Sequence, residues 1–112
     1  MTPRRGELWL VDFGKPVGVE QAGFRPALVV SDDLMNEGAS GLVIVIPLTT
    51  ARRRLPSHIE LDDPDTGLAE VSYAKCEDVK SVSVRRMVSR LGVAPPVAVA
   101  NVERILRFLL GL

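Results

Sequence analysis

Residues 18–31 read GVEQAGFRPALVVS and decide the fold, because a glycine-bracketed loop runs here directly into an apolar stretch. Pro26 disfavours the α region for Arg25 and biases its backbone toward an extended conformation. A proline also suits the first position of a strand. The sequence therefore predicts a buried strand over residues 27–30 with Arg25 at its entrance. A guanidinium in that place is a permanently charged, forked donor, which is suited to gripping a phosphate.

Apolar runs and turn residues divide the rest of the chain into short strands and one helix. Further strands are predicted over residues 7–13, 42–49, 59–61 and 87–93, one or two within 71–84, a connector with one helical turn over 32–41, and a turn over 62–67. Pro47, inside the second central strand, requires an edge, a bulge or a position without a ladder hydrogen bond. After Gly92, Pro95 and Pro96 suit a helix start, and apolar residues then recur at helical spacing until Gly111.

Short strands closed by one helix are typical of a small β-barrel. We therefore expect a single domain over residues 1–112, mainly β with a C-terminal helix (α+β), built as an SH3-like barrel that the helix covers. With 112 residues, 46% of them hydrophobic, the chain can bury its own core. The apolar run 42–48 is too short to span a bilayer and the N-terminus is not a signal peptide, which predicts a soluble cytoplasmic protein without membrane contact.

The cysteine and histidine counts restrict the chemistry of the chain. Cys76 is the single cysteine, so an internal disulfide is excluded, and one histidine leaves no Cys/His zinc site. That histidine, His58, cannot supply the acid and base of a two-histidine ribonuclease. We expect Cys76 and His58 to serve packing and no metal to be bound.

The charge of the chain points to local rather than global recognition of nucleic acid. Fourteen basic and fourteen acidic residues give no net charge, which excludes a protein that coats nucleic acid with one large electropositive surface. Basic residues nevertheless gather at 52–54 and at 85–90. The first run follows Thr49 closely enough to line an RNA path, while the second is equally compatible with a solvated loop. Aromatic residues make up 4% of the chain, too few for a sheet-wide stacking platform. Phe24, beside Arg25, either stacks on a base or plugs the loop.

Strand register brings two of these polar residues together. If residues 27–31 and 42–49 are consecutive antiparallel strands, a pairing of Ser31 with Val43 also sets Val29 against Val45 and Arg25 against Thr49. Arg25 and Thr49 then project from one face, close enough to address a single phosphate. A slip by one residue turns one of the two side chains to the opposite face.

The same stretch resembles the MazF/PemK/Kid family of toxin endoribonucleases, whose members carry G-x-E-Q-x-G-x-R-P before an apolar strand. Further matches, in the order of the family, are RGELW at 5–9, PLTT at 47–50, PSHI at 56–59 and VKS at 79–81. The resemblance spans nearly the whole chain. It implies a toxin fold of the Kid/CcdB type.

The resemblance also implies an activity. Arg25 and Thr49 would promote attack of a ribose 2′-hydroxyl on the adjacent phosphate of single-stranded mRNA, without metal or cofactor. The products would be a 2′,3′-cyclic phosphate and a free 5′-hydroxyl, and translation and growth would stop. Glu20, five residues before Arg25, would orient that arginine or act as the base. We favour orientation.

Eight residues are expected to bind RNA, and two positions depart from the family pattern. The expected RNA-binding residues are Phe24, Arg52, Arg53, Arg54, Glu77, Asp78, Lys80 and Ser81. Val19 stands where some members have histidine or serine, and Glu77-Asp78 stands where many read D-Q or E-Q. The cleaved sequence is therefore left open.

The implied partners are a second copy of the chain and an acidic MazE-like antitoxin, which would cover the basic RNA path and bind DNA together with the toxin. Two alternative functions are compatible with the same fold. One is a gyrase-poisoning toxin that performs no chemistry. The other is a non-catalytic SH3-like nucleic-acid-binding module, in which Arg25 and Thr49 are ordinary polar groups at strand ends.

Overall fold

The computed structural model describes residues 2–15, 18 and 23–112. Its strands are β1 (Glu7–Asp12), β2 (Phe24–Val29), β3 (Leu42–Thr49), β4 (His58–Leu61), β5 (Ser72–Lys75), β6 (Lys80–Ser83) and β7 (Met87–Val93). Its helices are α1 (Asp33–Glu37), α2 (Pro96–Leu110) and the 3-10 turns η1 (Pro64–Thr66), η2 (Cys76–Asp78) and η3 (Val84–Arg86). The predicted strands, helical turn and C-terminal helix are confirmed, and the segment 71–84 holds two strands.

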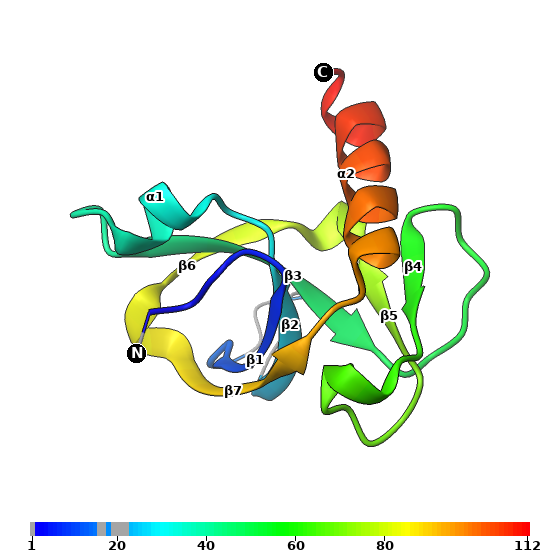
Figure 1. Ribbon diagram of the computed structural model, residues 1–112, viewed down its shortest axis with the longest axis horizontal. Coiled ribbons are helices and arrows are strands. Elements are labelled where there is room, and N and C mark those ends of the chain that lie inside the picture. Colours follow the sequence, from blue (N-terminus) through cyan, green and yellow to red (C-terminus); the bar gives the residue numbers. More distant parts are fainter. Residues whose placement is uncertain (1, 16–17, 19–22) are drawn as a thin grey trace.

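Within the described residues the strands form one seven-stranded antiparallel sheet in the order β4-β5-β3-β2-β1-β7, with β6 also beside β3 (Figure 1). β3 changes neighbours along its length: residues 42–45 pair with β6, and residues 48–49 pair with β5. Pro47 lies in the gap between the two pairings. Pro47 has no N–H to donate, and on that edge no ladder hydrogen bond is needed from it. This agrees with the requirement derived from the sequence.

Apolar side chains cover both faces of the sheet, because neighbouring residues of a strand point to opposite faces. One cluster, packed with α2, includes Leu8, Leu28, Ile46, Leu61, Ala74, Val102 and Ile105. The other, which we call the valine cluster, consists of Trp9, Val11, Phe13, Ala27, Val29, Val43, Val45 and Val82. α2 stands beside β4 and β5, and its C-terminal end extends past the sheet (Figure 1). The mainly β fold with a C-terminal helix is thus confirmed.

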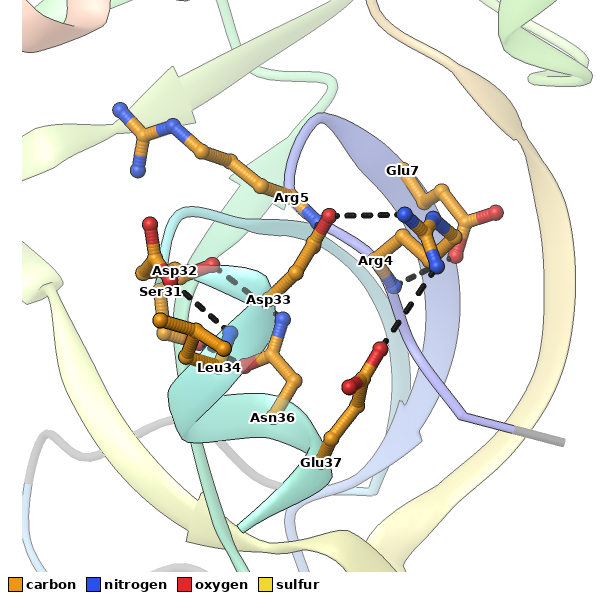
Figure 2. Close-up of polar contacts among 9 residues, drawn as sticks. All are labelled: Arg4, Arg5, Glu7, Ser31, Asp32, Asp33, Leu34, Asn36 and Glu37. Atoms are coloured by element: carbon orange, nitrogen blue, oxygen red, sulfur yellow. Dashed lines mark hydrogen bonds and ion pairs between the residues drawn. The ribbon is translucent and has the colours of Figure 1, made fainter.

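The N-terminal segment fastens α1 to the sheet (Figure 2). The Asp33 carboxylate accepts hydrogen bonds from the Arg5 backbone N–H (2.7 Å) and from Arg4 Nη2 (3.0 Å). Behind these exposed ion pairs, the buried Ser31 hydroxyl donates to the Asn36 amide oxygen. Exposed pairs contribute little to stability, so the buried polar contact is the stronger constraint on α1.

Glu7 joins β1 to the N-terminal segment and to β7. Its carboxylate accepts from the Trp9 indole (3.0 Å), the Arg4 backbone N–H (2.7 Å) and Arg90 Nε on β7 (2.6 Å). Burial alone raises the pKa of this carboxyl, but these hydrogen bonds and the charge of Arg90 outweigh it. The pKa of Glu7 therefore lies below its ordinary value of 4.5.

We expect Glu7→Gln to lower the free energy of unfolding at pH 7 by about 1 to 3 kcal/mol, since it removes a charged acceptor from three donors. A carboxyl with a lowered folded-state pKa stabilises the protein above pH 4.5, and this contribution disappears as pH falls through the folded-state value. Urea unfolding of both proteins from pH 7 to pH 3 should therefore show the difference shrinking in acid. A difference independent of pH would contradict this assignment.

The turn at η1 lies directly on the backbone of β7. A Cβ atom at Gly67 would stand 2.0 Å from the Leu91 carbonyl oxygen, and one at Gly92 would stand 2.3 Å from the Asp65 carbonyl oxygen. Gly67 also has a φ of +68°, which side chains rarely adopt. The connection from β4 to β5 is therefore held against β7 at a distance that only glycine allows.

Gly67→Ala should lower the free energy of unfolding by more than about 2 kcal/mol, because a left-handed backbone and a steric clash add. Gly41→Ala is the matched control: Gly41 has a φ of +70° and nothing within 4 Å of an added Cβ. We expect that variant to lose only about 1 kcal/mol. If urea unfolding gives equal losses of unfolding free energy for both variants, the β7 backbone can move away from an added Cβ at little cost, and the prediction is wrong.

Candidate functional site

Strands β2 and β3 bring Arg25 and Thr49 to adjoining strand ends. The paired residues run from Ala27 with Pro47 to Val29 with Val45, which confirms the predicted register over this stretch. Continued by two residues to the ends of both strands, the same register sets Arg25 opposite Thr49. Opposed residues have Cα atoms about 4.5 to 5.5 Å apart and share a face.

The ladder does not extend in the other direction to the predicted pair of Ser31 with Val43. Instead, the Ile44 carbonyl accepts from the backbone N–H groups of both Val30 (2.9 Å) and Ser31 (3.3 Å). The Ile44 N–H donates to the Ser31 hydroxyl at 2.9 Å. The Ser31 side chain thus replaces a backbone partner at the start of the α1 connector.

Arg25 and Thr49 lie on the valine-cluster side of the sheet, at its rim. Arg25 is exposed and Thr49 is half-buried. The Thr49 hydroxyl oxygen accepts the Ala51 N–H at 3.1 Å, which fixes the oxygen and leaves its O–H available as a donor. Arg25 is also opposite Val11 of β1, so its backbone is held between two strands.

Two further polar residues continue this alignment across the sheet. Thr49 is opposite Tyr73 of β5, and Tyr73 is opposite Glu60 of β4. We call Arg25, Thr49, Tyr73 and Glu60 the row, since they occupy one line across four neighbouring strands and point to one face. The opposite face of β4 and β5 holds Leu61 and Ala74 under α2.

A cavity of about 360 Å³ lies at the Glu60 end of the row. Its lining residues are Arg52, Arg54, Leu55, Pro56, His58, Glu60 and Tyr73. We call it the β3–β4 cavity, because the loop between these strands forms much of its wall. The structure thus brings two of the three predicted RNA-binding arginines into one cavity with Tyr73 and Glu60 of the row.

Arg54 has an unusual backbone. Its φ is +56°, and among the described residues it is the non-glycine residue with a positive φ. For an L-residue with a Cβ this conformation costs roughly 1 to 2 kcal/mol. Such strain is concentrated at functional sites in proteins, which fits the place of Arg54 in the cavity wall.

Lys80 and Ser81 lie apart from the β3–β4 cavity. They line a second hollow of about 370 Å³ with Phe13, Lys15 and Arg86 among others. The Lys80 ammonium stands 5.4 Å from the centre of the Phe13 ring, and Phe13 belongs to the valine cluster. Phe24 is 66% exposed, so it does not plug the core.

The predicted pair Glu77 and Asp78 is engaged within η2. Glu77 Oε2 lies 2.8 Å from His58 Nε2, and Asp78 forms an ion pair with Lys75 at 2.8 Å. Burial alone raises the pKa of Glu77, but hydrogen bonds from His58, its own backbone and Ser57 outweigh this effect. The pKa of Glu77 therefore lies below its ordinary value of 4.5. The His58 side chain is only 2% exposed, so it holds η2 against β4 from the interior.

One predicted catalytic residue lies outside the described part of the chain. Glu20, like Val19, lies outside the described residues. Sequence reasoning missed Tyr73 and Glu60. The alternation of Ile59 and Leu61 put Glu60 on the polar face of its strand, but nothing in the sequence gave the pairing of β4 and β5 with β3.

Clusters of metal-ligating side chains and membrane-spanning helices are both absent from the described residues. Residues 2–15, 18 and 23–112 contain no group of three or more His, Cys, Asp or Glu side chains placed to hold a metal ion. In the same part of the chain, no helix has the length and apolar character that crossing a membrane demands.

The model of a family described as PemK-like, MazF-like toxin of type II toxin–antitoxin system matches residues 4–110. The chain belongs to this family, as the sequence predicted.

Relatives support the same assignment. Endoribonuclease MazF9 of Mycobacterium tuberculosis is 32% identical over 97% of both chains, and endoribonuclease EndoA of Bacillus subtilis is 28% identical over 81% of this chain and 79% of its own. The crystal structure of MazF from Deinococcus radiodurans matches with a TM-score of 0.88 and 31% identity, covering 100% of this chain and 99% of that one. A MazE–MazF complex from the same organism matches at 0.83 and 32%, covering 100% and 98%.

The reactivity of the Cys76 thiol, which is buried at the start of η2, can be tested. Burial, followed by the neighbouring Glu77 carboxylate, raises the pKa of its thiol to about 11. Since the thiolate is the reactive form, folded protein at pH 7.5 should react with iodoacetamide on the order of 100-fold more slowly than urea-unfolded protein. Prompt labelling of folded protein would contradict the burial of Cys76.

Proposed function

We propose that this protein is the toxin of a type II toxin–antitoxin system and a metal-independent endoribonuclease specific for single-stranded mRNA. The observation that supports the proposal is the register of β2 and β3 from Ala27 with Pro47 to Val29 with Val45. Continued by two residues, this register would set Arg25 opposite Thr49. Family membership and the endoribonuclease relatives agree with it. Cleavage would arrest translation and growth.

The proposed reaction joins and breaks bonds at one phosphorus atom. The ribose 2′-oxygen attacks the adjacent phosphate and loses its proton, and the 5′-oxygen of the next nucleotide leaves and takes up a proton. The products are a 2′,3′-cyclic phosphate and a 5′-hydroxyl. A guanidinium remains charged at neutral pH, so Arg25 stabilises the extra negative charge of the phosphorane rather than donating a proton.

Thr49 and Glu20 complete this proposed centre. The Thr49 oxygen is already held by the Ala51 N–H, so its own O–H is directed to a non-bridging phosphate oxygen. Glu20 orients Arg25 or accepts the 2′-hydroxyl proton. Positioned donors of this kind cost no reorganisation during the reaction.

The RNA chain is proposed to follow the rim from the loop of Arg52, Arg53 and Arg54 past the row toward Lys80 and Ser81. Phe24, exposed beside Arg25, stacks on an unpaired base. Glu77 and Asp78 are paired with His58 and Lys75, so their contact with a base would use the remaining carboxylate oxygens.

A homodimer and an acidic MazE-like antitoxin are proposed as partners, with action in the cytoplasm. Solved complexes of relatives with their antitoxins support the second of these. Apolar side chains at the end of α2, namely Phe108, Leu110 and Leu112, are 59% to 83% exposed and offer surface for such contacts. An acidic segment across Arg52 and Arg54 would block RNA, and the complex would bind DNA.

Purified protein should cleave single-stranded RNA in EDTA and leave cyclic-phosphate ends. Arg25→Ala should lower the cleavage rate by ~10² to 10³ while changing RNA affinity far less. Thr49→Val should act in the same direction, and Thr49→Ser should restore most of the rate because it keeps the hydroxyl.

Arg104→Ala, an exposed position on α2, is the control for loss of one positive charge. Intact RNA with wild-type protein, or equal rates for wild-type and Arg25→Ala, would refute the proposed activity. Inhibition of DNA supercoiling with intact RNA would favour a gyrase-poisoning toxin.

A further inference from the structure

The Glu60 carboxylate, at the end of the row, is unexpected beside the proposed path of RNA, because RNA is itself negatively charged. Glu60 is exposed and lines the β3–β4 cavity together with Arg52 and Arg54. Across the residues that the structure describes, no ion pair joins Glu60 to either arginine. An RNA phosphate would be repelled here, so the RNA groups that suit Glu60 are hydrogen-bond donors. The bases are the main source of such donors.

The spacing of the row matches one nucleotide. Neighbouring strands lie about 4.8 Å apart, so Glu60, two strands beyond Thr49, is about 10 Å from it across the sheet. This is comparable to the reach of a nucleotide from its phosphate to the far edge of its base. A phosphate bound at Thr49 therefore brings an attached base over β5 and its Watson–Crick edge to β4.

Tyr73 occupies the place between the phosphate and the carboxylate. It is half-buried, opposite both Thr49 and Glu60, and it lines the same cavity. Single-stranded RNA is recognised by unstacked bases that lie on aromatic rings and are read along their Watson–Crick edges. Tyr73 thus provides the stacking surface, and Glu60 stands where the base edge ends.

We propose that Tyr73 stacks on a base that flanks the scissile phosphate, and that Glu60 selects a base with an amino group on its Watson–Crick edge. Guanine fits best, because its N1–H and N2 amino group present two parallel donors to the two carboxylate oxygens. Adenine and cytosine offer one amino group each, and uracil offers none. This inference rests on the proposed cleavage at Arg25 and Thr49.

The test is to sequence the ends produced from a single-stranded RNA library of random sequence. Wild-type protein should favour guanine over uracil roughly 10-fold to 100-fold at one fixed position next to the cut. Glu60→Gln replaces one acceptor by a donor, so this preference should fall about 10-fold or more while preferences at other positions stay. Tyr73→Leu should slow cleavage roughly 10-fold without reordering the bases.

Glu70→Gln is the matched control for charge. Glu70 is exposed and lines a different hollow, with Asp62 and Pro64. Its substitution removes the same negative charge outside the β3–β4 cavity, so an effect of net charge alone appears in both variants. The base preference of Glu70→Gln should equal that of wild type.

The inference is overturned if wild type and Glu60→Gln share one base preference, or if wild type favours uracil or no base at both flanking positions. Binding separates this failure from failure of the proposed cleavage. The probes are fluorescent single-stranded RNAs, 2′-O-methylated throughout, with one central guanine or uracil. If wild type cleaves nothing, tighter binding of the guanine RNA that Glu60→Gln loses supports base selection, and equal binding overturns it.

Discussion

The split pairing of β3 is the constraint on which the rest of the structure depends. Residues 45–47 of β3 pair with β2 on one edge, while the other edge is shared between β6 and β5. Pro47 marks the change, since a residue without an N–H is tolerated where no ladder bond is needed. By taking β5 as a second partner, the end of β3 gains two more strands. Without that change, Thr49 would lie at a sheet edge and Tyr73 would have no fixed place beside it.

A protein with no net charge can still bind a polyanion, because positive and negative side chains are distributed unevenly over its surface. Several carboxylates away from the row are engaged by cations, among them Glu7 with Arg90 and Glu103 with Arg5. Charges are screened beyond about 8 Å at physiological salt, so RNA senses mainly the groups that line its path. In the β3–β4 cavity those groups are two arginines and one carboxylate. Such a mixture favours discrimination between bases over tight general binding.

Local patterns predicted most of the fold, whereas the site needed contacts between distant segments. Prolines and apolar runs gave β3 and β7 with their observed bounds, and the hypothesised register is confirmed near Val29. The pairing of Thr49 with Tyr73 depends on how two loops fold, and composition does not encode that. The partner of His58 is likewise nineteen residues away, at Glu77. Backbone features such as the positive φ of Arg54 leave no trace in side-chain periodicity.

The row lies on paired strands, whereas Arg52 and Arg54 lie in the loop between β3 and β4, and this difference fits their proposed roles. Arg25 stands on a strand held by β1 and β3, and apolar clusters pack both faces of that sheet. Positioned donors accelerate a reaction only if their geometry is fixed before the substrate arrives. Contacts with RNA phosphates tolerate more variation, because charge attraction depends weakly on angle. It is therefore consistent that Arg25 and Thr49, both proposed for chemistry, occupy strands, while Arg52 and Arg54 occupy a loop.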